Sequence, residues 1–205
     1  MEIVQGDLLQ GSETVIAHQV NGHAVRPHGL SEAVARRFPY ADVYGRRATA
    51  GSGKNCCAPA DRAVPGTIVV DNADKKHGRV TVVHLVAQAY MGKPGAYAAY
   101  VDPDPSSRVP DTAADRLGYF RQCLGTLEAR ILHEGWTRVA FPHLIGCGLA
   151  GGEWEQYRDA LEESARRLSG RCRFVICKLS ASATVSQTHR DAKQRSVRDM
   201  LLQKC

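Results

Sequence analysis

The hydrophobic and polar positions of this chain form two kinds of segment. Short apolar runs rich in β-branched residues are predicted to be strands; they cover residues 2–5, 15–20, 67–70, 80–86, 138–142 and 173–179. Segments with apolar residues three and four positions apart are predicted to be helices; they cover residues 31–38, 113–134 and 153–168. Strands that alternate with helices indicate a three-layer α/β/α domain.

Two segments do not follow this pattern. Residues 91–110 are rich in Gly, Pro, Ala and Tyr and are predicted to be irregular, either as a lid or binding loop or as a surface insertion. Residues 180–205 have five basic and two acidic residues near their end, a net charge of +3, and are predicted to be a poorly ordered basic tail. We therefore divide the chain into a domain, residues 1–179, and this tail.

Composition limits the classes of protein to consider. A chain of 205 residues suits one globular domain, and it has no apolar run long enough to span a membrane and no recognisable signal peptide. Its seven cysteines form no C-x-x-C pair, so we expect reduced thiols in the cytoplasm or nucleus. The pI is about 9.0, which suits an anionic ligand. The positive charges are spread over several helices, so nucleic-acid binding is not expected, except as an alternative role for the tail.

The most informative motif is a glycine-rich loop between a predicted strand and a predicted helix. Residues 146–152 contain four glycines in seven positions. Glycine lets the backbone approach a ligand with its N–H groups, and the following helix adds the positive end of its dipole. This combination predicts an anion site, most naturally for a phosphate or diphosphate. The loop is not a P-loop, because no Lys-Ser/Thr pair follows it.

A second strand, loop and helix lie near the N-terminus. The strand at residues 15–20 continues into Asn21 and a loop with glycines and histidines, which ends at Gly29 before the helix. Asp7 follows the first strand. Two such loops side by side can hold a diphosphate from both faces, while the carboxylate accepts a hydrogen bond from a base or sugar.

With these motifs in order, the chain resembles the macrodomain family, which binds ADP-ribose. The matching segments are residues 6–8 (GDL), 16–21 (IAHQVN), 29–35 (GLSEAVA), 82–88 (VVHLVAQ), 141–149 (FPHLIGCGL) and 154–155 (WE). The resemblance covers residues 1–179. It is nearest to the minimal branch, which includes ADP-ribose 1″-phosphate phosphatases and hydrolases of ADP-ribosyl esters. The family fold implies an α/β/α sandwich with a mixed central sheet of about six strands.

The resemblance also implies roles for individual residues. Asp7 would accept a hydrogen bond from the adenine amino group, with the backbone of Leu8 assisting, and Asn21 would lie beside the distal ribose. The remaining positions would contact the ligand around the diphosphate: Gly29, Leu30, Gly146, Cys147, Gly148, Leu149, Ala150 and Gly151. Two alternatives remain open: Asp7 only caps a turn, and Asn21 only supplies a turn residue before a glycine.

Three histidines raise the question of a metal. His18, His23 and His28 recur every five residues, but His18 lies within a predicted strand, so the three do not share one face. We therefore expect no zinc site, and no cofactor. His23 or His28 could act as a general acid or base beside the distal ribose. An exposed loop histidine without a role is the alternative for each, and we take His28 as the catalytic candidate together with Asn21.

The chain departs from those family members that release ADP-ribose through a lysine adduct. Gln88 stands where the resemblance places the lysine, and Ala150 replaces the expected carboxylate. The remaining hypothesis is metal-independent hydrolysis of an ADP-ribose 1″ derivative by water. Asn21 would then position the sugar or water, and His28 would transfer a proton. The alternative is a non-catalytic reader of free or protein-linked ADP-ribose. We expect a monomer whose partner is ADP-ribose or an ADP-ribosylated protein.

Overall fold

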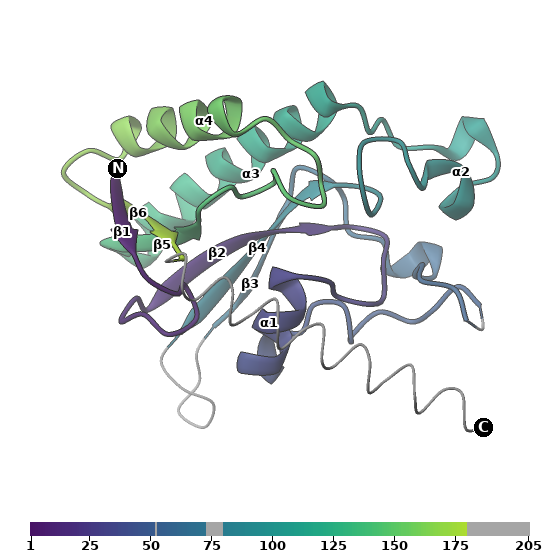
Figure 1. Cartoon of the computed structure of the whole chain (residues 1–205), viewed down its shortest axis with the longest axis horizontal. Coiled ribbons are helices and arrows are strands. Elements are labelled where there is room, and N and C mark those ends of the chain that lie inside the picture. The colour runs from purple at the N-terminus through teal and green to yellow at the C-terminus, as the bar shows by residue number, and fades with distance from the viewer. Residues whose placement is uncertain (52, 73–79, 180–205) are drawn as a thin grey trace.

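The computed structural model describes residues 1–51, 53–72 and 80–179 (Figure 1). Its strands are β1 (Glu2–Gln5), β2 (Val15–Asn21), β3 (Ile68–Asp71), β4 (Thr81–Gln88), β5 (Arg138–Pro142) and β6 (Arg173–Lys178). Its helices are α1 (Leu30–Arg37), α2 (Ala98–Val101), α3 (Ala113–Glu134) and α4 (Trp154–Arg167), with 3-10 turns at Pro39–Ala41, Pro59–Asp61 and Pro105–Ser107. The basic tail lies outside the described residues.

The six strands form one mixed sheet in the order β1-β6-β5-β2-β4-β3. Every neighbouring pair is parallel except β3 and β4, which are antiparallel. The predicted α/β class and mixed sheet of about six strands are therefore confirmed. The parallel strands all end at the same edge of the sheet, and in open α/β sheets this carboxyl edge is where ligands bind.

Helices cover both faces of the sheet. Figure 1 shows α3 and α4 on one face and α1 on the other. Because neighbouring residues of a strand point to opposite faces, Ala17 of β2 belongs to the core under α3 and α4, while Ile16 packs with Val34 of α1. Burial on both faces explains why the strands are almost continuously apolar.

Residues 91–110 contain more structure than predicted. Their proline and glycine content indicated irregular backbone, but α2 and a 3-10 turn lie within the segment. The Tyr90 hydroxyl donates to Asp102 Oδ2 at 2.8 Å, and Arg62 forms an ion pair with the same carboxylate at 2.8 Å. The backbone between these short elements is irregular, and residues outside the segment hold it in place.

Two further findings concern the helices and the cysteines. No helix in the described ranges is long and apolar enough to cross a bilayer. The six cysteines within these ranges are free thiols, and all but Cys147 are buried.

Candidate functional site

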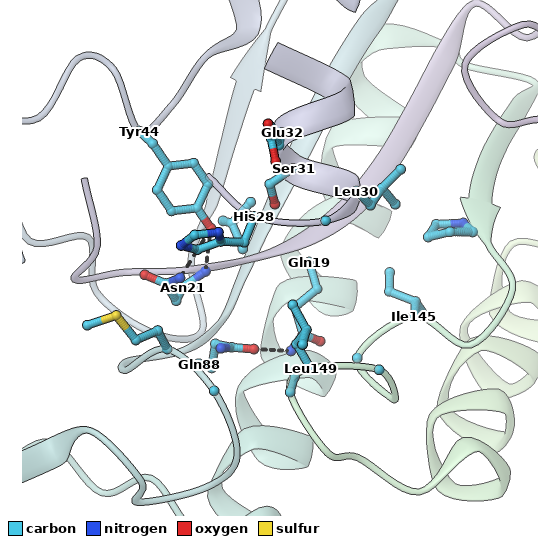
Figure 2. A pocket seen from close by; sticks show the side chains of 18 of the residues that line it. Gln19, Asn21, His28, Leu30, Ser31, Glu32, Tyr44, Gln88, Ile145 and Leu149 are labelled. Carbon is cyan, nitrogen blue, oxygen red and sulfur yellow. Dashed lines mark hydrogen bonds between the residues drawn. The ribbon is translucent and has the colours of Figure 1, made fainter. Parts of the chain in front are cut away.

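A cavity of about 840 Å³ opens at the carboxyl edge of the sheet. Most of its walls come from four segments: the end of β2, the start of α1, residues 91–100, and the loop that follows β5 (Figure 2). Tyr44, Asn55 and Gln88 complete the lining. Small-molecule sites in proteins commonly enclose about 300–1,000 Å³. The cavity is therefore large enough for a nucleotide-sized ligand.

The glycine-rich loop after β5 forms one wall, and part of its hydrogen-bonding capacity is used internally. Cys147 N donates to Leu144 O at 2.9 Å, and Gly151 N donates to Gly148 O at 3.1 Å. Within the described part of the chain, the N–H groups of Gly148, Leu149 and Ala150 have no protein acceptor, and all three residues line the cavity. Consecutive free N–H groups of this kind form a site for an anion.

The loop needs glycine at two positions where the backbone is left-handed. Gly146 has φ 75° and Gly151 has φ 72°. A Cβ on Gly146 would lie 2.4 Å from the ring of Tyr157, and one on Gly151 would lie 3.3 Å from Lys93 Cγ. Leu144, at the start of the loop, has φ 60° and is the one residue other than glycine with positive φ in the described ranges. Such backbone strain is often found at ligand sites.

The N-terminus of α1 forms a second wall with anion-binding character. Its N-cap, Gly29, has φ 57° and provides no side-chain cap, so the first N–H groups of the helix lack the usual partner. Gly29, Leu30 and Ser31 all line the cavity. A Cβ on Gly29 would lie 3.8 Å from Leu149 Cδ1, so the Leu149 side chain spans the distance between the two loops.

Asn21 lies at the end of β2 and is held firmly in the cavity wall. Its Oδ1 accepts from Ala24 N at 2.8 Å, while its N and Nδ2 donate to the Tyr44 hydroxyl at 3.1 and 3.3 Å (Figure 2). Arg47 Nη1 donates to Asn21 O at 3.0 Å. Burial raises the pKa of Tyr44. Asn21 therefore organises the turn after β2 and also faces the cavity, and it does so as the last residue of the strand rather than as a left-handed turn residue.

The three histidines are not close enough to share a ligand. His28 is exposed and lines the cavity. His23 is 2% exposed, packs edge-to-face on Tyr90, and its pKa is lowered to about 4 by burial, with the charge of Arg62 adding to the effect. His18 lies in the core with its Nε2 2.8 Å from His84 Nδ1. Among the described residues no three His, Cys, Asp or Glu side chains are grouped as metal ligands.

Four of the residues expected to bind ligand do not line this cavity. Asp7 caps a turn: its Oδ1 accepts from Leu9 N at 2.9 Å and its Oδ2 accepts from Gln10 Nε2 at 3.0 Å. Leu8 is buried in the core beneath α1. Cys147 donates its thiol to Ile145 O, and burial raises its pKa to about 11. Gly151 packs against residue Lys93.

The cavity also contains residues to which the sequence assigned no role. Tyr44, Met91, Tyr97 and Tyr100 line it, the last two as an edge-to-face pair 6.3 Å apart. Tyr100 lies in α2 and the others lie in loops, and the position of these segments relative to β2 follows only from the tertiary contacts. Gln88 also lines the cavity. The sequence signal for its place there is a polar residue at the end of the apolar strand β4.

Gln88 is fixed by two hydrogen bonds. Its Nε2 donates to Tyr90 O at 2.8 Å, and its Oε1 accepts from Gln19 Nε2 at 2.8 Å (Figure 2). Among the lining side chains Glu32 is the one carboxylate, and within the described ranges no lysine or arginine contributes. A phosphate in this cavity would therefore depend on backbone N–H groups.

The glycines of the loop have the same spacing as those of a dinucleotide-binding turn. Gly146, Gly148 and Gly151 have the spacing G-x-G-x-x-G, after a strand and before a helix. In a dinucleotide-binding unit the next strand leads to an acidic residue that binds a ribose. Here that strand, β6, ends with Cys177 and Lys178, so the carboxylate is missing.

No protein-family model and no curated protein matches the sequence. Solved structures do match. The macrodomain of Mycobacterium tuberculosis DarG is 20% identical over 86% of this chain and 95% of that chain, with a TM-score of 0.60. The macrodomain of Thermus aquaticus DarG is 19% identical over 87% and 97% of the two chains, with a TM-score of 0.57. An Oceanobacillus iheyensis macrodomain solved with ADP is 13% identical over 96% and 91%, with a TM-score of 0.52.

These likenesses establish the fold. The chain has the α/β/α macrodomain fold, as the resemblance in the sequence implied. Identities of 20% or less do not carry an activity from one protein to another, because function depends on the site rather than on the fold.

Proposed function

We propose that this chain binds ADP-ribose in the cavity and hydrolyses a 1″ derivative of it. One observation carries the binding proposal: Gly148, Leu149 and Ala150, whose N–H groups have no acceptor among the described residues, line the same cavity as the uncapped N-terminus of α1. Two sets of N–H donors on facing loops suit the two phosphates of a diphosphate. The ADP in the structure of the Oceanobacillus macrodomain supports the same ligand class.

Two polar residues, Asn21 and Asp7, indicate which way round the ligand would bind. Asn21 Nδ2 uses one hydrogen on Tyr44, so its second hydrogen can donate to a hydroxyl of the distal ribose. Asp7 lies at the carboxyl edge of the sheet beyond β1. Its carboxylate makes two hydrogen bonds, and a carboxylate has about four acceptor sites. We propose that the adenine extends beyond the lined cavity toward Asp7 and that its amino group donates to one of the remaining sites.

The hydrolytic step uses water and needs no metal. The water oxygen forms a bond to C1″, or to phosphorus in a 1″-phosphate, while the bond to the leaving oxygen breaks. His28 takes a proton from the water. When phosphorus is attacked, His28 gives this proton to the leaving sugar oxygen; when C1″ is attacked, the carboxylate or phosphate leaves as an anion and His28 releases the proton to solvent. Asn21 orients the sugar, and the loop N–H groups stabilise the developing negative charge. Gln88 cannot replace a lysine nucleophile, because a carboxamide is not nucleophilic and both its ends are hydrogen-bonded.

The first test is calorimetric titration with ADP-ribose, with AMP and NAD as controls. We expect a low-micromolar dissociation constant for ADP-ribose and much weaker binding of both controls. Absence of ADP-ribose binding at millimolar concentration would contradict the proposal.

The second test is turnover of ADP-ribose 1″-phosphate and of an ADP-ribosyl ester. We expect His28→Ala or Asn21→Ala to lower kcat by about 100-fold or more while changing ADP-ribose affinity much less. His133→Ala is the matched control, because this histidine is on the surface of α3 and its side chain is 78% exposed. Tight binding without turnover of either substrate would favour the alternative function, a non-catalytic reader of free or protein-linked ADP-ribose.

A further inference from the structure

Arg116 is a buried arginine to which neither the fold nor the proposed reaction assigns a role. It lies in the first turn of α3 and is 1% exposed, the largest fully buried side chain in the described ranges. A buried guanidinium needs compensating partners, because its charge loses the favourable interaction with water. Its partners therefore indicate what it does.

The charge of Arg116 is balanced by Asp111. Arg116 Nε donates to Asp111 Oδ1 at 2.8 Å, and Nη2 donates to Oδ2 at 2.6 Å, a bidentate arrangement. Asp111 is 7% exposed, and its Oδ2 also accepts from Gly95 N at 3.0 Å. The carboxylate thus joins α3 to the segment that follows β4.

The other donors of Arg116 reach two walls of the cavity. Nη1 donates to Gly92 O at 2.7 Å and to Ala150 O at 3.0 Å. Nη2 is also 3.3 Å from Tyr90 O and 3.4 Å from Lys93 O. Gly92 and Ala150 both line the cavity, whereas Arg116 does not. One guanidinium therefore holds the glycine-rich loop against the segment of residues 91–100.

The bond to Ala150 bears on how the loop presents its N–H groups. A carbonyl oxygen turned into the cavity would repel a phosphate, whereas Arg116 holds the Ala150 carbonyl toward a buried group outside the lining. Binding of an anion by a loop that is already ordered costs less conformational entropy. We propose that Arg116, held by Asp111, is a positioning residue that preorganises Gly148, Leu149 and Ala150 for the diphosphate. This inference rests on the proposed function, because the diphosphate belongs to the ligand proposed there.

The test compares Arg116→Lys with Arg121→Lys, an exposed arginine on the same helix. Lysine keeps the charge but cannot reproduce the forked set of donors. We expect Arg116→Lys to speed amide hydrogen exchange at least tenfold at Cys147, Gly151 and Gly152, whose N–H groups donate to carbonyls within the loop, in the ligand-free protein. Exchange in β4 and β6 should be unchanged. ADP-ribose affinity is expected to fall at least tenfold. Arg121→Lys is expected to change neither quantity.

The two readouts separate this inference from the proposed function. If the wild-type protein binds no ADP-ribose, the proposed function fails, and hydrogen exchange still decides whether Arg116 orders the loop. If Arg116→Lys does not fold, the double variant Arg116→Met/Asp111→Leu replaces it, because an apolar pair can fill a buried ion-pair site without unpaired charge. A folded variant with wild-type exchange at Cys147, Gly151 and Gly152, or with faster exchange spread evenly over the sheet, overturns the inference.

Discussion

At the scale of single residues, Gly146 shows how tightly the loop is built into the domain. Its φ of 75° is strained for any side chain, and its Cα faces the ring of Tyr157 and Gln19 Oε1. Gly148, two positions further on, has nothing within 4 Å of a built Cβ. Glycine is therefore required at position 146 because a side chain would clash, whereas at position 148 a side chain would meet no protein atom.

This contrast gives a prediction on stability. Gly146→Ala should lower the free energy of unfolding by about 3 kcal/mol, because the methyl group overlaps the Tyr157 ring and the left-handed backbone is strained. Gly148→Ala, the matched control, should change it by less than about 1 kcal/mol. Urea unfolding of both variants measures the difference. Equal losses of stability in the two variants would contradict the packing at Gly146.

At the scale of elements, α3 brings the core and the site together. A capping box starts the helix: Thr112 Oγ1 accepts from Asp115 N at 3.1 Å, and Thr112 N donates to Asp115 Oδ2 at 2.9 Å. Gly135, with φ 68°, ends it. Phe120 and Leu127 then pack into the core from one face of the helix. The capping box also fixes the turn that carries Arg116.

The cap can be tested separately from the site. Thr112→Ala should destabilise the protein by about 1 kcal/mol, because the N–H of Asp115 loses its acceptor. Thr126→Ala is the matched control: Thr126 is exposed in the middle of the same helix, where alanine is the better helix former. Thermal unfolding should show a lower Tm for Thr112→Ala alone. A lower Tm for both variants would mean that the loss comes from something other than the cap.

At the scale of the whole molecule, several buried titratable groups link stability to pH. Burial, with the nearby His84, lowers the pKa of His18. Burial also lowers the pKa of His84, although the hydrogen bond that His84 donates to Asp71 opposes this effect. Burial alone would raise the pKa of Asp71, but hydrogen bonds from His84 and Arg46 outweigh it and lower that pKa. All of these groups bind protons more weakly in the folded state, so acid favours unfolding.

We therefore expect stability to be greatest above pH 6.5 and to fall as the pH is lowered. His23 gives the clearest window, from the usual pKa of 6.5 to about 4 in the folded protein. Protonation of the unfolded chain over this window costs on the order of 3 kcal/mol of stability. His23→Phe should remove part of this pH dependence, whereas His133→Ala on the surface should not. Urea unfolding at pH 7.5, 5.5 and 4.5 measures it, and identical slopes in all three proteins would contradict the assignment.

The sequence predicted most elements to within two residues because their signals are local. The helix predicted over residues 113–134 is observed with the same limits as α3, because a capping threonine precedes it and a glycine follows it. Local signals failed for His23, which lies in a loop with Gly22 and looked able to titrate near neutral pH. The structure buries it against Tyr90, a residue of a different loop.

The sequence by itself determined the α/β architecture, the two glycine-bearing loops and the place of Asn21 at the end of a strand. These features depend on hydrophobic period and glycine content, which act over a few neighbouring residues. Only the tertiary structure decided which groups meet at the cavity. It formed hydrogen bonds between Tyr44 and Asn21, Gln19 and Gln88, and Arg116 and Ala150, which are separated by 23, 69 and 34 positions in the sequence. Such pairs form when strands align and loops fold over their ends, and no pattern along the chain encodes the distance between them.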